Sequence, residues 1–109
     1  MDEYVRPHPD RAALLTIDTQ NDFTLPGAPA EIDGTAAAVP EMARLVDAFR
    51  DADAPVVHVV RLYERDGSNV DRCRRGAVES GDAVVAPGSE GAELVDALEP
   101  DPEVDLDAE

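Results

Sequence analysis

The sequence predicts an α/β fold built around a parallel sheet, and three stretches of its 109 residues support this prediction. Residues 12–17 form an apolar run that ends in a polar, turn-forming cluster, which is typical of a buried strand. Residues 39–49 carry apolar side chains at three- and four-residue steps, as a helix does, and residues 56–60 are rich in β-branched side chains. A strand, a helix and a second strand joined by short loops form a βαβ unit with parallel strands.

The helix between the two strands follows a loop that runs from Pro26 to Gly34. We expect the helix to begin at Thr35 or Val39, with Pro40 in its first turn. Its buried stripe consists of the apolar positions Val39, Met42, Leu45, Val46 and Phe49. Strands as apolar as residues 12–17 and 56–60 are expected to be covered on both faces.

Two further helices are predicted in the second half of the chain. The first begins after Asn69 and turns Val70, Cys73 and Ala77 inward. Its outer face carries the arginines Arg72, Arg74 and Arg75. The second spans residues 89–98, with Ala92, Leu94, Val95 and Leu98 on its apolar face.

From Glu99 to Glu109 an acidic residue occupies every odd position. This alternation is compatible with a strand that has one acidic face, or with a frayed acidic tail, and we adopt the tail as the prediction for residues 99–109. Residues 1–109 as a whole are predicted to form a single domain. Because two confident strands are few for a parallel sheet, the chain is expected to be the N-terminal part of a larger fold, truncated after its first strands.

The charge of the chain narrows the classes of partner. Its 25 acidic and 9 basic residues give a formal net charge of −16, and every basic residue is arginine. This balance argues against binding to nucleic acid and disfavours anionic membranes, because both require clustered basic side chains. Such acidity in the absence of lysine indicates the acidic proteome of a halophilic organism, where salt screens the repulsion between surface charges.

The sequence shows no pattern of a disulfide, a metal site or a cofactor site. Its one cysteine excludes an internal disulfide, and no spacing of cysteine or histidine is typical of zinc ligands. The N-terminus has no profile of a secretion signal, and no apolar stretch approaches the roughly 20 residues of a membrane span. A cytoplasmic protein without metal or cofactor is therefore expected.

Asp18 is the leading candidate for a functional residue, since it lies at the exit of the first strand, where α/β proteins place their sites. The stretch around it, Leu14-Leu15-Thr16-Ile17-Asp18-Thr19-Gln20-Asn21-Asp22-Phe23, is followed by Pro26-Gly27, by Pro55-Val56-Val57-His58-Val59 and by Pro87-Gly88-Ser89-Glu90-Gly91-Ala92-Glu93-Leu94. In this order and spacing, these segments resemble the isochorismatase-like cysteine hydrolases, which include nicotinamidases, N-carbamoylsarcosine amidases and isochorismatases.

The resemblance implies a Rossmann-like three-layer α/β/α sandwich and the hydrolysis of an amide or related bond of a small-molecule substrate by an Asp, Lys and Cys triad. Asp18 matches the catalytic Asp of the family, and Phe23 matches an aromatic residue that lines the substrate pocket. Gln20 and Asn21 are interpreted as structural. The Lys and the nucleophilic Cys have no counterpart before Glu109, so the chain by itself is expected to be an incomplete and inactive member of the family.

Some family members carry an Asp-x-His metal pair after the second strand, where this chain has Arg61-Leu62-Tyr63. This departure favours a metal-free branch of the family outside the nicotinamidases.

Other readings of the same residues remain open. Cys73 has arginine neighbours that favour a thiolate, but its helical spacing indicates a small core residue. His58 is expected to be a hydrogen-bonded core histidine, and His8 an exposed linker residue. A phosphoacceptor receiver-like signalling domain would also place acids at strand ends. A non-catalytic remnant that forms a homo-oligomer, or pairs with another subunit through an unpaired sheet edge, is the third alternative.

Overall fold

The structure, a computed structural model that describes residues 2–109, contains a three-stranded parallel sheet in the order β1-β2-β3. The strands are β1 (Leu14–Ile17), β2 (Val56–Val59) and β3 (Asp105–Ala108). Ile17 pairs with Val59, and Val59 pairs with Ala108, so the three strands end at the same edge of the sheet. The predicted α/β class and the parallel βαβ unit are confirmed.

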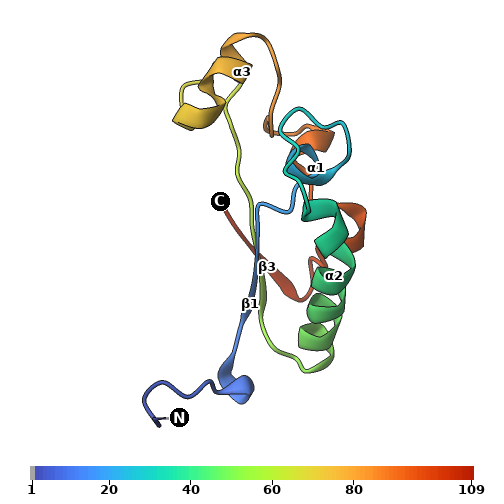
Figure 1. Cartoon of the computed structure of the whole chain (residues 1–109). Helices are drawn as coiled ribbons and strands as arrows, with labels where there is room; N and C mark the ends of the chain where they lie inside the picture. Colours follow the sequence, from blue (N-terminus) through green and yellow to red (C-terminus); the bar gives the residue numbers. More distant parts are fainter. Residues whose placement is uncertain (1) are drawn as a thin grey trace.

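Helix α2 (Thr35–Asp51) connects β1 to β2 and lies along one face of the strands (Figure 1). Its stripe of apolar side chains packs on Val56, Val95 and Leu98, with Val46 at the centre of the contact. Gly34, at a φ of +87°, precedes the first helical residue. The helix therefore begins early enough that Pro40 lies inside it rather than in its first turn, which corrects the prediction.

Leu45 was also predicted to belong to the buried stripe, and this prediction is wrong because its side chain is 52% exposed. The core under α2 includes the helix residues Val39, Met42, Val46 and Phe49, and Leu45 is not part of it. A second apolar core forms beyond the carboxyl ends of the strands. It consists of Phe23, Ala30, Tyr63, Val84, Val85 and Ala92.

The segments around this second core are short. Helix α1 (Asn21–Thr24) begins four residues after the end of β1 and contributes Phe23 to this core. The 3-10 turn η1 (Pro9–Arg11) lies before β1, at the other end of the sheet. The predicted helix at 89–98 is instead two 3-10 turns, η3 (Glu90–Ala92) and η4 (Asp96–Leu98), separated by an extended stretch. The Glu93 carbonyl accepts a hydrogen bond from the Asn21 N–H, and the Val95 N–H donates to Thr19. These bonds to the residues after β1 replace the bonds of a continuous helix.

The predicted helix after Asn69 is shorter than expected. The 3-10 turn η2 (Arg72–Arg74) leads into α3 (Arg75–Glu79). Cys73 is exposed, so the interpretation as an inward-facing core residue is wrong. Arg74 lies over the Phe23 ring, at 5.5 Å from its centroid, instead of pointing into solvent. The 3-10 geometry of residues 72–74 changes which side chains share a face.

The interpretation of residues 99–109 as a frayed tail is also wrong, because residues 105–108 form β3. The alternative, a strand with one acidic face, is the arrangement found. The Asp105 side chain is 1% exposed and forms an ion pair with Arg50 of α2. This ion pair, with a buried carboxylate and a partly exposed guanidinium, links the strand to the helix. The alternation of acids in the sequence does not reveal this contact.

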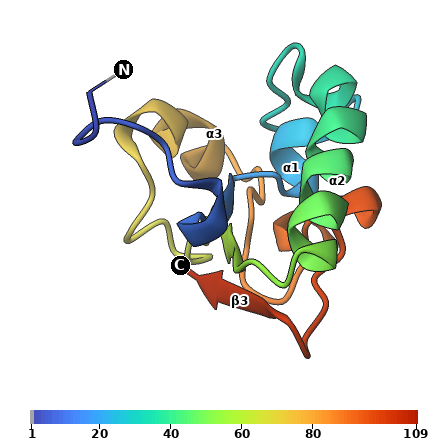
Figure 2. The ribbon, with the colours of Figure 1, turned by 90° about the horizontal axis from the view of Figure 1, so that it is seen from below.

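The described residues supply two layers of the three-layer sandwich. Among elements of residues 2–109, α2 is the helix that contacts β1 and β2. Figure 2 shows α1 and α2 grouped on one side and α3 set apart from them. The opposite face of the sheet carries Leu15, Ile17 and Leu106, which are all exposed. In the described chain no helix combines the length and the apolar character needed to cross a membrane.

Candidate functional site

Asp18 is the first residue after β1, and its backbone bends sharply at the end of the strand. Its φ of +57° is in the left-handed region, which aspartate tolerates better than most residues. Its N–H donates to the Val59 carbonyl at 3.0 Å, which extends the pairing of β1 with β2 by one bond. The bend leaves the carboxylate 31% exposed at the carboxyl edge of the sheet.

The cation beside Asp18 is Arg61, which follows β2 by two residues. The Arg61 Nε donates to Asp18 Oδ2 at 3.3 Å, and its Nη1 donates to the carboxylate of Asp71. Partial burial disfavours the charged guanidinium, but the two carboxylates outweigh this effect and raise the pKa of Arg61 above its ordinary value. The guanidinium of Arg61 therefore stays charged across the physiological pH range.

Gln20 fixes the position of Arg61 through the backbone. Its fully buried amide donates to the Arg61 carbonyl at 2.7 Å and accepts from the Arg61 N–H at 2.8 Å. The same amide donates to the Ala92 carbonyl at 2.9 Å. Gln20 thus ties the exits of β1 and β2 to η3, which confirms its interpretation as structural. Asn21 has a similar role, since its side chain donates to the Glu90 carbonyl.

Asp71 and Tyr63 extend the polar cluster beyond Arg61. The Tyr63 hydroxyl donates to Asp71 Oδ2 at 2.7 Å. Burial of the ring, together with this hydrogen bond to a carboxylate, raises the pKa of Tyr63 above its usual value. The hydroxyl therefore remains a hydrogen-bond donor at neutral pH.

A groove of about 440 Å³ opens over these side chains at the carboxyl edge of the sheet. Its walls are formed by residues 17–18, residues 59–63, Asn69, Asp71 and Glu109. Ligand sites in open α/β sheets occupy this edge. The structure therefore brings Asp18 together with one arginine and two further carboxylates in a single groove.

The other sequence candidates lie outside this groove. Phe23 is 3% exposed and belongs to the second core, and it does not line the groove. Cys73 is also absent from the groove wall. His8 is exposed, as predicted. Within residues 2–109 no group of three or more histidine, cysteine or acidic side chains is arranged to hold a metal ion.

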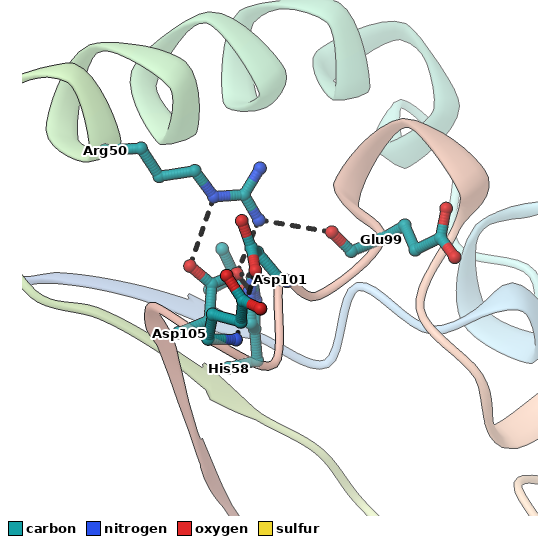
Figure 3. Close-up of polar contacts among 7 residues, drawn as sticks. Arg50, His58, Glu99, Asp101 and Asp105 are labelled. Atoms are coloured by element: carbon teal, nitrogen blue, oxygen red, sulfur yellow. Dashed lines mark hydrogen bonds and ion pairs between the residues drawn. The ribbon is translucent and has the colours of Figure 1, made fainter.

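His58 lies in a separate, buried polar network between the sheet and α2 (Figure 3). Its Nε2 lies 2.6 Å from Asp105 Oδ2, and its Nδ1 lies 2.7 Å from Thr16 Oγ1. The side chain of Arg50 donates to the same Asp105 carboxylate, and Nε does so at 3.1 Å. These bonds hold the pKa of Asp105 well below its usual range, with the hydrogen bond from Arg50 as the main cause. His58 is fully buried, so the prediction of a hydrogen-bonded core histidine is confirmed.

Sequence reasoning missed Arg61 and Asp71 as members of the site. The place of Arg61 in the site could have been predicted, because Arg61 follows the second strand and the carboxyl ends of neighbouring parallel strands meet at one edge of the sheet. Asp71 is in a loop eight residues after Tyr63, and no spacing rule connects it with the site. Its place depends on the fold of residues 64–70.

Comparison with known proteins gives a consistent result. The sequence profile of the family described as the isochorismatase domain matches residues 12–106. A protein of Arabidopsis thaliana, named a "probable inactive nicotinamidase", is 41% identical over 87 residues, which cover 79% of this chain and 44% of the plant protein.

Solved structures agree in fold. An isochorismatase family protein from Desulfovibrio vulgaris is 40% identical and superposes with a TM-score of 0.80, over 87% of this chain and 50% of the other. A cysteine hydrolase from Pseudomonas syringae is 27% identical, with a TM-score of 0.76, over 93% of this chain and 46% of the other. The chain thus spans about half the length of the proteins it matches.

Proposed function

The chain belongs to the isochorismatase family, and from this premise we propose that it supplies the Asp18 part of a thiol-dependent hydrolase centre that cleaves an amide or related bond of a small molecule. The observation that carries the proposal is the position of the Asp18 carboxylate. It lies at the carboxyl end of a parallel strand, partly exposed, facing a groove large enough for a small ligand.

Asp18 would act as the proton carrier of the reaction. In the first step a cysteine thiol transfers its proton to the Asp18 carboxylate, and the sulfur attacks the carbonyl carbon of the substrate. The same proton then passes to the departing amine as the carbon–nitrogen bond breaks, which leaves a thioester. Water then hydrolyses the thioester, with Asp18 carrying a proton from the water to the sulfur, which releases the acid product and regenerates the thiol.

Arg61 supports this role through charge and geometry. Its guanidinium holds one oxygen of Asp18 and keeps the second oxygen free for proton transfer. The thiol is not supplied by Cys73, which is exposed and absent from the groove wall. The proposal therefore requires a cysteine from polypeptide outside residues 2–109, so that the isolated chain has no turnover.

A chimera tests the proposal. Residues 1–109 are fused to the part of the Desulfovibrio vulgaris relative that this chain does not cover, and the product is assayed on a panel of small amides beside the intact relative. Thioester formation is followed by intact mass. We expect turnover by the chimera and a loss of about 100-fold or more in Asp18→Asn, the usual effect of removing a proton-transfer group.

Asp107→Asn is the matched control, because Asp107 is an exposed carboxylate on β3 outside the groove wall. Its turnover should equal that of the parent chimera. Turnover by Asp18→Asn within twofold of the parent would refute the role of Asp18.

For Phe23 we propose a contact with the substrate, as its place in the motif suggests. Since the ring is buried beneath Arg74, such a contact requires Arg74 to move aside when substrate binds. A higher KM with unchanged kcat in a Phe23→Leu chimera supports this contact. A loss of thermal stability in the Phe23→Leu chimera without a change in KM would show that Phe23 is a core residue only.

A further inference from the structure

Arg61 has a long side chain that needs more than Asp18 to keep one orientation over the groove. Its side chain is 41% exposed, and its contact with Asp18 is one hydrogen bond from Nε at 3.3 Å. Strong charge-assisted bonds of this type are about 2.7–2.9 Å long, so this one is weak. Exposed ion pairs barely offset the entropy that is lost when two side chains are fixed. A second contact must therefore hold the guanidinium in place.

Asp71 supplies this second contact. Its Oδ2 accepts a hydrogen bond from Arg61 Nη1, whereas Asp18 binds Nε. The two carboxylates thus bind one guanidinium at two different nitrogens. Because a guanidinium is planar and rigid, contacts at two nitrogens fix its orientation as well as its position.

The Asp71 carboxylate is itself held by a rigid partner. The Tyr63 hydroxyl donates to the same Oδ2 at 2.7 Å. Tyr63 is 3% exposed and belongs to the second apolar core, where close packing leaves its ring little freedom to move. The hydroxyl therefore defines one position for the carboxylate at the rim of the groove.

The loop before Asp71 returns the chain to the end of β2. The Asn69 side chain closes this loop, since its Nδ2 donates to the Leu62 carbonyl at 2.9 Å and its Oδ1 accepts from the Glu64 N–H at 2.7 Å. Both partners lie in the segment that follows β2. As a result Asp71 lies beside Arg61, although the two are 10 positions apart in the sequence.

Stability is a poor explanation for this arrangement. The side chains of Asp18, Arg61 and Asp71 are 31%, 41% and 45% exposed, and ion pairs this exposed contribute little to the free energy of unfolding. What the arrangement achieves is to hold one cation against one oxygen of Asp18. A proton carrier requires such control, because its other oxygen must face the reacting atoms in a fixed geometry.

We propose that Asp71 is a positioning residue of the hydrolase centre. Together with Tyr63 it holds the Arg61 guanidinium in the orientation that leaves one oxygen of Asp18 free. Asp71 acts through Arg61, whose guanidinium binds both carboxylates. The inference rests on the proposed function of Asp18 and extends that centre to a residue of the loop after β2.

Hydrogen exchange at the guanidinium tests the contact in the isolated chain, where no turnover is needed. The chain has nine arginines, so nuclear magnetic resonance of a sample labelled with 15N-arginine gives at most nine Nε–H signals, and Arg61→Lys identifies the signal of Arg61. We expect this Nε–H to exchange with water about fivefold or more slowly than that of the exposed Arg72. Asp71→Asn should remove most of this difference.

Turnover of the chimera defined above tests the effect on chemistry. Asp71→Asn should lower kcat about tenfold with KM unchanged, because a misplaced cation disturbs proton transfer and not binding. Asp71→Glu keeps the charge and should recover part of this loss. In an Arg61→Met background, Asp71→Asn should have no further effect, since the residue through which it acts is gone.

Asp66→Asn is the matched control. Asp66 is an exposed carboxylate of the same loop, and its side chain accepts a hydrogen bond from the Ser68 N–H. Both the exchange rate at Arg61 and the turnover of the chimera should equal those of the parent in this variant.

Three results would overturn the inference. The first is exchange at the Arg61 Nε–H that is unchanged or slower in Asp71→Asn. The second is a kcat of the Asp71→Asn chimera within twofold of the parent. The third is an additive loss in the Arg61→Met background, because Asp71 would then act independently of Arg61. Failure of the proposed function gives a different result, since Asp18→Asn would then keep its turnover while Asp71→Asn still speeds exchange at Arg61.

Discussion

The two faces of the sheet do not follow the simple rule that polar side chains are exposed and apolar side chains are buried. On the face under α2, the polar side chains of Thr16 and His58 are buried, and so is the Asp105 carboxylate. On the opposite face, which we call the open face, the apolar side chains of Leu15 and Leu106 are exposed. Burial in this chain thus follows the position of α2 and not the polarity of the residue.

The difference shows how each face is stabilised. The covered face tolerates a charged group because each polar atom of the Asp105 and His58 side chains has a partner, and because apolar contacts with α2 surround the network. The open face gains almost nothing from its apolar residues while they remain in water. Truncation of the same side chain in the core under α2 and on the open face should therefore have unequal effects on the free energy of unfolding.

Leu98→Ala and Leu106→Ala should differ most. Leu98 is fully buried against α2, so its truncation should cost about 3 kcal/mol of the free energy of unfolding, whereas Leu106→Ala should cost no more than about 0.5 kcal/mol. Urea unfolding measures both variants through the transition midpoint at an unchanged slope. A loss above about 1.5 kcal/mol for Leu106→Ala would mean that the open face is already covered in solution.

Asp105→Asn and Asp107→Asn compare two carboxylates of β3. Asp105 accepts hydrogen bonds from Arg50 and His58, and loss of its charge should cost about 2 kcal/mol, since Arg50 keeps partial access to water. Asp107 is exposed, so its substitution should stay within about 0.5 kcal/mol. Similar losses in the two variants would show that the buried network contributes little to stability.

The depressed pKa of Asp105 predicts an acid-dependent loss of this contribution. A carboxyl with a lower pKa in the folded state stabilises the fold above its unfolded pKa, about 3.9, and loses that effect as the pH falls through the folded value. The stability difference between the parent chain and Asp105→Asn should be constant from pH 7 to about pH 5 and should narrow below about pH 4. Urea unfolding across this range measures it, and a difference that narrows above pH 5 would point to another titrating group.

The sequence was sufficient to predict the covered half of this comparison. The apolar run before Asp18, the helical stripe from Val39 to Phe49 and the β-branched run at 56–60 each follow the period of the element that they form. The third strand was not predictable in the same way. Its alternating acids are typical of solvent-exposed residues. Asp105 is buried because it pairs with Arg50 and His58, which are far from it in the sequence.

The site was predictable at the position of Asp18 and not in its surroundings. A residue that ends a strand is located by local pattern alone. The contact of Arg61 with Asp18 joins residues 43 apart, and the role of Asp71 depends on how residues 64–70 fold. Phe23 occupies the expected place in the motif, yet the packing of Arg74 over its ring is a tertiary contact that local patterns do not encode.

The ion pair of Asp18 with Arg61 should contribute least to stability, in contrast to the pair of the buried Asp105 carboxylate with Arg50. Both side chains are partly exposed, at 31% and 41%, and such pairs contribute at most about 1 kcal/mol. Asp18→Asn isolates the charge, because asparagine also tolerates the positive φ, whereas Asp18→Val adds backbone strain. Thermal unfolding of the isolated chain should place Asp18→Asn near the parent and Asp18→Val clearly below both. If Asp18→Asn were as damaging as Asp105→Asn, the carboxylate would be a structural group, and its exposure in the groove would lose its functional meaning.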